Sequence, residues 1–234
     1  MLKVQNIHTY YGQSHILQGV SLRVERGEIV LLSGRNGAGK TTTIRSIMGL
    51  VPPKSGEIQF LEEKITGIPV HLISQKRISL VPEGRKIIPG LSVFENLKLA
   101  TLKNRDKTRS AGLLEQIAQI FPRLKERWTQ EGTSLSGGEQ QMLAIARALV
   151  SDPLLILIDE PSEGLSPIMV EKIAEVLKEI QRKGTTILLV EQNTDMALEI
   201  SDRCYLMDEG VIKFEGSPEE IKSNEEIQRE YLAI

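Results

Sequence analysis

The segment GRNGAGKT, residues 34–41, has the residue types and spacing of a loop that binds phosphate groups. It lies between the apolar run IVLLS and the helical pattern TTTIRSIM. Glycines let backbone N–H groups curl around phosphate oxygens, and the following helix directs its positive end toward them. Lys40 would bridge the β- and γ-phosphates, and the Thr41 hydroxyl would hold Mg²⁺. The alternative, an ordinary glycine turn, is disfavoured by this context. The candidate binding residues are Gly34, Arg35, Asn36, Gly37, Ala38, Gly39, Lys40, Thr41 and Thr42.

Two carboxylates follow another apolar run, LLILI at residues 154–158. Ligands of open α/β sheets bind at the carboxyl ends of the strands, so Asp159 and Glu160 are expected on the side of the phosphate loop. Asp159 suits a Mg²⁺ ligand that acts mostly through water, and Glu160 is placed to polarise an attacking water. In isolation an acidic pair after a strand is often a solvated turn. Together with the phosphate loop, it indicates a Mg²⁺-dependent nucleoside triphosphatase or kinase.

The stretch LSGGEQQ, residues 135–141, begins a predicted helix in an unusual way. Ser136 can cap the helix, and Glu139 can reach back to the cap as a capping box. Gly137 and Gly138 remain unexplained, because each costs roughly 0.5 to 1 kcal/mol relative to alanine inside a helix. We therefore expect another group to come close to this backbone.

The phosphate loop, LSGGEQ and LLILIDEP, in this order, closely resemble the ATP-binding subunits of ABC transporters over essentially the whole chain. The resemblance implies ATP and Mg²⁺ as cofactors and ATP hydrolysis coupled to transport. It also implies a head-to-tail dimer in which the signature helix of one subunit caps the ATP bound by the other. The signature residues are Ser136, Gly137, Gly138 and Glu139. A plain P-loop kinase would leave this motif unexplained.

By the same resemblance Tyr11, in TYYG, is expected to stack on adenine, although the adjacent Tyr10 leaves the choice between them open. The GLSP segment, residues 164–167, would touch the partner subunit. Two positions depart from the family pattern. Glu83 replaces the usual glutamine that senses Mg²⁺, and it adds a negative charge near the triphosphate that is tolerable if Mg²⁺ or Arg85 is close. Gln192 replaces the switch histidine; it can donate a hydrogen bond but cannot carry an imidazolium charge.

The segments LVPEGR, DEPSEGLSP and LVEQN resemble one branch of the family, the ATPases of branched-chain (hydrophobic) amino-acid importers. The alternatives are a urea or amide importer, or a soluble ABC-type ATPase that acts on nucleic acid or ribosomes. The resemblance to the amino-acid importers implies integral membrane permeases, a second ATPase subunit that differs from this one, and indirectly a solute-binding protein. It also implies a peripheral location on the cytoplasmic face of the cell's inner membrane.

The elements that must position these residues follow from hydrophobic patterning. The first 60 residues are β-rich, ISLV at 78–81 is a strand, and 167–183 is an amphipathic helix between two apolar strands. YLMDEGVIKFEG is expected as a hairpin, with a Ser217-capped helix after it. The predicted fold is α/β: a P-loop NTPase (RecA-like) core with a parallel sheet, an N-terminal antiparallel β subdomain and a helical subdomain insertion. Residues 1–83 and 135–234 form the core in this interpretation, and 84–134 form the helical subdomain.

Composition narrows the partners. The chain has 234 residues, a net charge of -2 and only 4% aromatic residues, so a nucleic-acid partner is not expected. The single cysteine, Cys204, fits a reducing compartment, and we expect it to be a small buried apolar residue. The longest apolar runs are much shorter than the ~20 residues of a membrane-spanning helix, so any membrane role must come through a partner.

Overall fold

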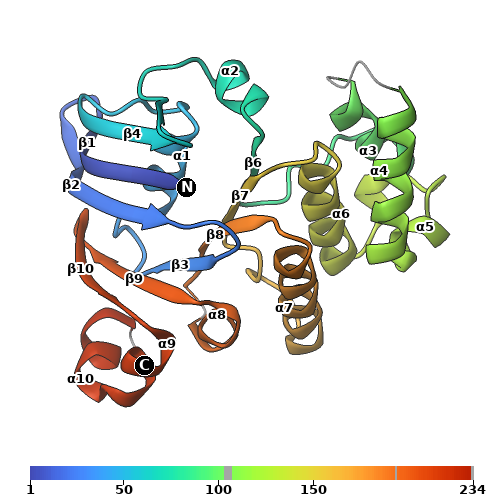
Figure 1. Ribbon diagram of the computed structural model, residues 1–234. Coiled ribbons are helices and arrows are strands. Elements are labelled where there is room, and N and C mark those ends of the chain that lie inside the picture. Colours follow the sequence, from blue (N-terminus) through green and yellow to red (C-terminus); the bar gives the residue numbers. More distant parts are fainter. Residues whose placement is uncertain (103–106, 193, 233–234) are drawn as a thin grey trace.

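The computed structural model describes residues 1–102, 107–192 and 194–232. Within them the chain forms two sheets with helices packed between and beside them (Figure 1). Three sequence segments reach outside these ranges: part of the charged linker KNRDKTR, the asparagine of LVEQN, and the last two residues of YLAI.

The antiparallel sheet comes first along the chain, as predicted for the N-terminal segment. Its described strands lie in the order β2-β1-β4-β5. Their bounds are β1 (Leu2–Tyr11), β2 (Ser14–Val24), β4 (Ser55–Phe60) and β5 (Glu63–Lys64). Leu2 pairs with Val24 and Val4 pairs with Leu22, and these apolar residues are buried while Lys3 and Arg23 between them are exposed. This alternation gives the sheet one core-facing side and one exposed side.

The second sheet is the core of the fold, and its described strands lie in the order β10-β9-β3-β8-β7-β6. Its strands are β3 (Ile29–Ser33), β6 (Ile78–Val81), β7 (Leu155–Asp159), β8 (Thr186–Val190), β9 (Arg203–Asp208) and β10 (Val211–Gly216). All neighbours run parallel except β9 and β10, which form the predicted hairpin. Every residue of β3, β7 and β8 is buried, which is why these strands are continuously apolar in sequence.

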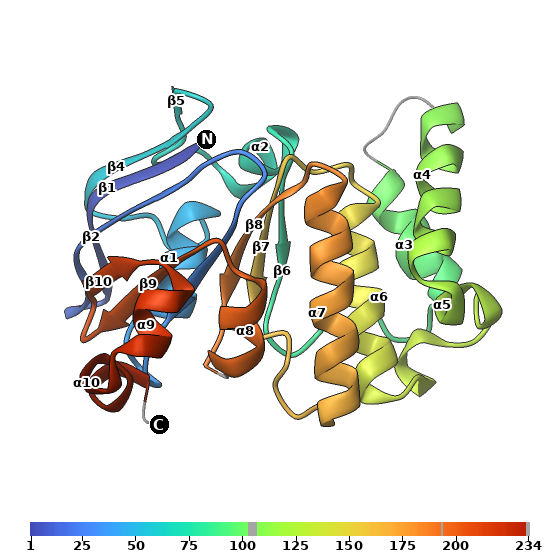
Figure 2. The same ribbon diagram turned by 60° about the horizontal axis from the view of Figure 1, so that its bottom comes forward.

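Alternate residues of these strands face two separate hydrophobic clusters. Leu32, Leu157 and Leu188 pack with α1 (Lys40–Ile47) and the antiparallel sheet. Leu31 and Ile158 pack on the other face, against the cluster that contains α7 (Pro167–Arg182) and α8 (Thr194–Ile200). Figure 2 shows α1 between the two sheets and α6, α7 and α8 beyond the core sheet. The prediction of a parallel sheet covered on both faces is confirmed.

The insertion between β6 and β7 is helical, as the pattern predicts. It contains α3 (Val93–Thr101), α4 (Lys107–Ile120), α5 (Pro122–Glu126) and a short 3-10 turn, η1 (Gly132–Ser134). The signature helix α6 (Gly137–Leu149) contacts α3 and α5 as well as β6. The helical side of the molecule therefore includes α6 (Figure 1).

The remaining helices are short. They are α2 (Val70–Gln75), α9 (Pro218–Ser223), α10 (Glu225–Ile227) and the π turn η2 (Gln228–Leu232). Ser217 caps α9 with a capping box, as predicted, whereas Ser166 occupies the N-cap of α7 without a side-chain cap hydrogen bond. None of the helices in the described ranges is both long and apolar enough to cross a lipid bilayer.

Candidate active site

A cavity of about 890 Å³ lies where β6, β7 and β8 end, beside the loop that leads from β3 into α1. Sequence-predicted residues from five separate segments line it. They are Tyr11, Asn36, Gly37, Gly39, Lys40, Thr41, Thr42, Glu83, Glu160 and Gln192. The fold therefore brings the phosphate loop and Glu160 together with Glu83 and Gln192, the two residues that depart from the family pattern.

Lys40 is almost completely buried, at 4% exposure, and is held by several oxygens. Its Nζ donates hydrogen bonds to the carbonyl oxygens of Gly34, at 2.8 Å, and Arg35, at 3.2 Å. The same nitrogen lies 3.5 Å from Glu160 Oε1. The ammonium group is thus fixed inside the loop and paired with the carboxylate that faces the cavity.

Thr41 lines the cavity and is hydrogen-bonded to Asp159. The Thr41 hydroxyl donates to Asp159 Oδ1 at 3.0 Å. Burial raises the pKa of the Asp159 carboxyl to about 6, and the charges of Glu160 and Glu83 act in the same direction. A divalent cation held by the Thr41 hydroxyl and the Asp159 carboxylate would offset this accumulation of negative charge. Mg²⁺ prefers such oxygen ligands, together with water and phosphate oxygens. The residues present therefore fit Mg²⁺.

The phosphate loop is held by contacts with β9 and with the C-terminal part of the chain. Gly34 has φ 150°, and a Cβ there would overlap the carbonyl oxygen of Met207 in β9, so only glycine fits. The Gly210 N–H donates to the Ala38 carbonyl at 2.9 Å, and the Arg35 guanidinium donates to the Arg229 carbonyl at 3.2 Å. α1 begins at Lys40 without a side-chain cap or an acidic residue in its first turn. Its first N–H groups are therefore suited to bind an anion in the cavity.

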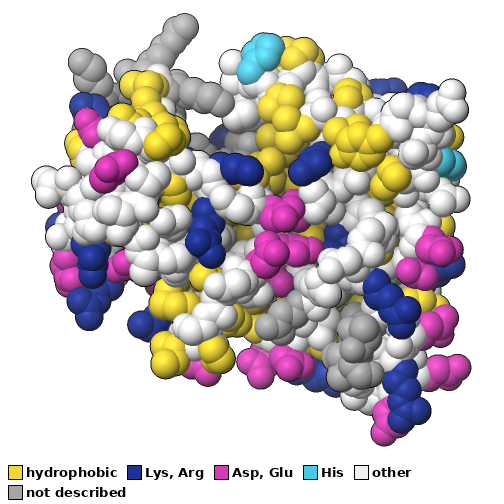
Figure 3. Space-filling view, turned by 180° about the vertical axis from the view of Figure 1, so that it is seen from behind, with side chains coloured by type: hydrophobic (Ala, Val, Ile, Leu, Met, Phe, Trp, Pro, Cys, Tyr) yellow, Lys and Arg dark blue, Asp and Glu magenta, His cyan; other side chains and the backbone are white. Residues whose placement is uncertain are grey.

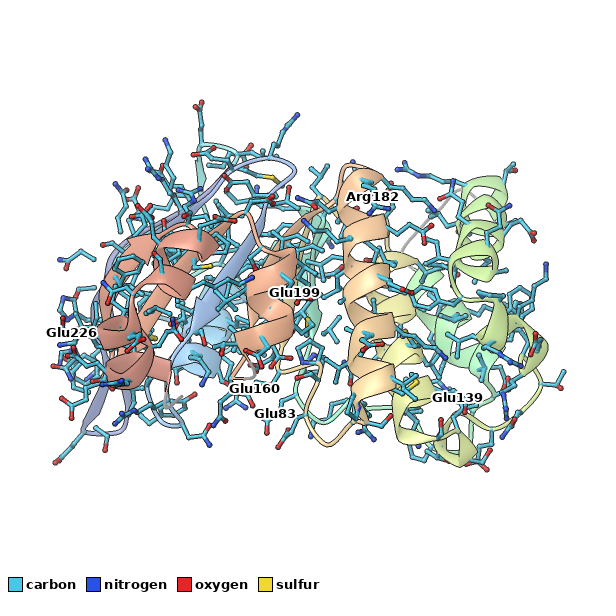
Figure 4. All side chains as sticks on the ribbon, turned by 90° about the horizontal axis from the view of Figure 1, so that it is seen from below. Glu83, Glu139, Glu160, Arg182, Glu199 and Glu226 are labelled. Carbon is cyan, nitrogen blue, oxygen red and sulfur yellow. The ribbon has the colours of Figure 1, made fainter. Side chains whose placement is uncertain are left out.

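Acidic side chains gather near the centre of the molecular face that is turned away in Figure 1, with Lys and Arg beside them (Figure 3). Glu83 and Glu160 lie near each other at this edge of the core sheet (Figure 4). The Arg85 guanidinium lies beside Gly137, at the start of α6. Arg45, one turn after Thr41 on α1, is a basic residue that interacts with Glu83. Its pKa is raised, first by a hydrogen bond with Tyr11 and also by the charges of Asp159 and Glu83.

The structure distinguishes the two adjacent tyrosines. Tyr11 lines the cavity and is 42% exposed. The Tyr10 ring instead stacks on His15, with centroids 4.2 Å apart, and Lys54 Nζ lies 4.3 Å from its centroid. Of the two, Tyr11 is the tyrosine that is exposed at the cavity.

The signature residues lie away from this cavity. Ser136 and Glu139 form the predicted capping box, in which the Ser136 N–H donates to Glu139 Oε2 at 3.0 Å. Both residues line a second cavity of about 530 Å³ next to α5 and α7. Figure 4 shows Glu139 on α6, separated from Glu160 by the width of α7. Within one chain, the signature does not reach the phosphate loop.

Gly138 has a packing role that the sequence does not reveal. It is buried, and a Cβ on it would overlap the Met169 side chain of α7. A Cβ on Gly137 would meet only the Arg85 guanidinium, at 3.0 Å from Nη1. The second glycine therefore leaves room for the Met169 side chain at the start of α7, in addition to any contact with a partner.

Sequence reasoning missed two residues next to the site, Arg45 and Glu191. Arg45 carries a detectable signal, because it lies four residues after Thr41 and so shares its helix face. Glu191 directly follows the apolar strand β8, as Glu160 follows β7, and it is only 2% exposed. Sequence analysis selected only its neighbour Gln192, because that residue departs from the family pattern.

Comparison with known proteins identifies a family and several relatives of this chain. The family described as ABC transporter matches residues 17–163. The high-affinity branched-chain amino acid transport ATP-binding protein BraG of Pseudomonas aeruginosa is 42% identical, with 99% of each chain covered. A probable branched-chain amino acid transport ATP-binding protein, LivF of Archaeoglobus fulgidus, is 35% identical over 100% of this chain and 99% of its own. The lipopolysaccharide export system ATP-binding protein LptB of Escherichia coli is 34% identical over 99% and 96%.

Solved structures give the same fold. One is the dimeric structure of a post-hydrolysis state of an ATP-binding cassette bound to ADP and Pi. It superimposes with a TM-score of 0.83 at 27% identity and covers 93% of this chain and 99% of its own.

Proposed function

This chain belongs to the ABC transporter family of ATP-binding proteins, and from that premise we propose that it drives the import of branched-chain amino acids. As a member of the family it binds and hydrolyses ATP, and cassettes of this kind act as dimers with membrane permeases. The assignment of the solute is supported by the two relatives named for branched-chain amino-acid transport, which match the chain over almost its full length.

We assign the chemistry to residues of the large cavity. The phosphate loop and the first turn of α1 would hold the phosphates, and Lys40 would turn from its loop carbonyls to the phosphate oxygens. Thr41 and Asp159 would hold Mg²⁺, with Glu83 nearby, and the cation would supply charge neutralisation at the phosphates. Glu160 would accept a proton from the attacking water, and Gln192 would donate a hydrogen bond to the terminal phosphate.

The dimer supplies what one chain lacks. We propose that Ser136, Gly137, Gly138 and Glu139 of one subunit complete the ATP site of the other, with Tyr11 stacking on adenine. Two features support this: the signature lies outside the cavity of its own chain, and it begins a helix whose N-terminus can face a phosphate. ATP would favour the closed dimer and ADP the open one, so hydrolysis would change the state of the permease.

The proposals on subdomains, partners and location follow from membership of the same family. We propose that residues 84–134 form a helical subdomain on which the permease docks, beside a core of residues 1–83 and 135–234. We further propose pairing with a different ATPase subunit in the cell, a peripheral position on the cytoplasmic face of the membrane, and a solute-binding protein as an indirect partner.

The observation that carries the function is that Lys40, Thr41 and Glu160 line one cavity, where Lys40 pairs with Glu160 and the Thr41 hydroxyl donates to Asp159. The test is uptake of radiolabelled leucine, isoleucine and valine, with urea and acetamide in parallel, in a strain that lacks the chain. Uptake of the three amino acids should fall and return with the wild-type chain but not with Glu160→Gln. Loss of urea or amide uptake with normal leucine uptake would contradict the proposed solute.

A further inference from the structure

Glu191 is a buried carboxylate at the junction of three segments of the active site. It follows β8 directly and precedes Gln192, which lines the cavity. Only 2% of the residue is exposed. Because burying a carboxylate is costly unless donors satisfy it, its contacts are the key to its role.

The side chain of Glu191 holds the loop that follows Glu160. The backbone N–H of Ser162 donates to Glu191 Oε1 at 2.8 Å, and this hydrogen bond is buried. Ser162 itself is only 7% exposed. Without this acceptor, the loop would contain a buried N–H that must find another partner, at a cost comparable to a lost hydrogen bond.

The backbone around Glu191 links the same loop to the phosphate loop. The Ser33 hydroxyl, just before Gly34, donates to the Glu191 carbonyl at 2.8 Å. The Glu160 N–H donates to the carbonyl of Val190 at 2.9 Å. Glu160 has φ 45°, a left-handed conformation that is unfavourable for a side chain other than glycine and that persists only when neighbours impose it.

We propose that Glu191 is a positioning residue: its carboxylate fixes the loop of residues 160–165 through the Ser162 N–H and so keeps Glu160 directed at the cavity and Lys40. This inference rests on the proposed catalytic role of Glu160. Because Gln192 directly follows Glu191, its backbone is held by the same hydrogen bonds as that loop.

The test compares three substitutions at position 191 in the full-length chain. Glu191→Ala removes the acceptor and should lower kcat about 10- to 100-fold, while the KM for ATP changes less than about threefold. Glu191→Gln keeps an acceptor oxygen at the same reach and should retain kcat within about threefold of wild type. Glu191→Asp keeps the charge but is too short for the contact, so it should behave like Glu191→Ala.

Hydrogen exchange supplies a readout beyond activity. The Ser162 amide should lose protection in Glu191→Ala and Glu191→Asp and keep it in Glu191→Gln. Glu199→Ala, which removes an exposed glutamate on α8, is the matched control and should leave both readouts unchanged. If Glu191→Ala does not fold, the order of Glu191→Gln above Glu191→Asp decides the question.

Two results would overturn the positioning role: wild-type kcat in the folded Glu191→Ala or Glu191→Asp variant, or an equal loss in Glu191→Gln and Glu191→Asp. Glu160→Gln, measured in the same assay, separates the positioning role of Glu191 from the proposed catalytic role of Glu160. Full turnover by that variant would remove the proposed function of Glu160 itself, whatever position 191 does.

Discussion

Lys40 Nζ lies 3.5 Å from Glu160 Oε1, so the lysine of the phosphate loop and the carboxylate after β7 form an ion pair across the cavity. A triphosphate would attract Lys40 away from this carboxylate and leave Glu160 available to a water molecule. We therefore predict that Glu160→Gln binds ATP as tightly as wild type or more tightly, because the competing partner of Lys40 is gone. Its turnover should fall at least ~100-fold, since the general base is lost.

The measurements are phosphate release and equilibrium nucleotide binding on the same preparation. Size-exclusion chromatography should also show an ATP-bound dimer of the Glu160→Gln variant, with Lys40→Ala as the control that weakens ATP binding. Phosphate release at the wild-type rate would exclude Glu160 as the base.

Asp159 should make the stability of the nucleotide-free, Mg²⁺-free protein depend on pH. Its pKa is about 6 in the folded chain against the ordinary value of 3.8, so the folded state binds more protons between these values. The free energy of unfolding therefore falls as pH rises through about 6. Asp159→Asn should be more stable than wild type above pH 7, by on the order of 2 to 3 kcal/mol, with the difference vanishing below about pH 4. Urea unfolding across this range checks the prediction, and a constant difference would contradict it.

The residue at position 192 should affect how ATP turnover depends on pH. An imidazole at the switch position titrates near pH 6.5, whereas a glutamine does not. We predict that Gln192→His hydrolyses ATP within about threefold of wild type at pH 8, because both side chains donate one hydrogen bond. The variant should acquire an inflection between about pH 6 and 7 that wild type lacks. Identical kcat profiles for the two proteins from pH 5.5 to 9 would show that position 192 does not reach the reacting phosphate.

The two signature glycines should differ in their effect on stability. Gly138→Ala places a Cβ against Met169 and should lower the free energy of unfolding by about 1 to 3 kcal/mol. Gly137→Ala meets only a flexible guanidinium and should be neutral, or stabilising by up to about 1 kcal/mol. Adding Met169→Ala to Gly138→Ala should remove the overlap, so the double-mutant cycle should show a favourable coupling. Equal effects of the two glycine substitutions would contradict the packing role.

Much of this structure could be predicted from the sequence because the signals are local. The phosphate loop combines its glycines, Lys40 and Thr41 within one strand-loop-helix unit, and the fully buried strands are apolar throughout. The missed features join residues far apart in the chain. The hydrogen bond from Ser162 to Glu191 and the contact between Gly138 and Met169 depend on how loops and helices meet. The interaction of Arg45 with Glu83 is of the same kind, because it joins α1 to the segment that follows β6.

The central claim is that the ATP site is completed by the signature of a second subunit. Its most direct test is ATP turnover by Ser136→Arg at saturating ATP, with nucleotide affinity measured on the same protein. Ser136 lies outside the cavity of its own chain, so ATP affinity of the monomer should stay within about twofold of wild type. Turnover should fall at least ~10-fold, because the arginine blocks closure of the dimer. Hydrolysis at the wild-type rate by Ser136→Arg would contradict the shared site.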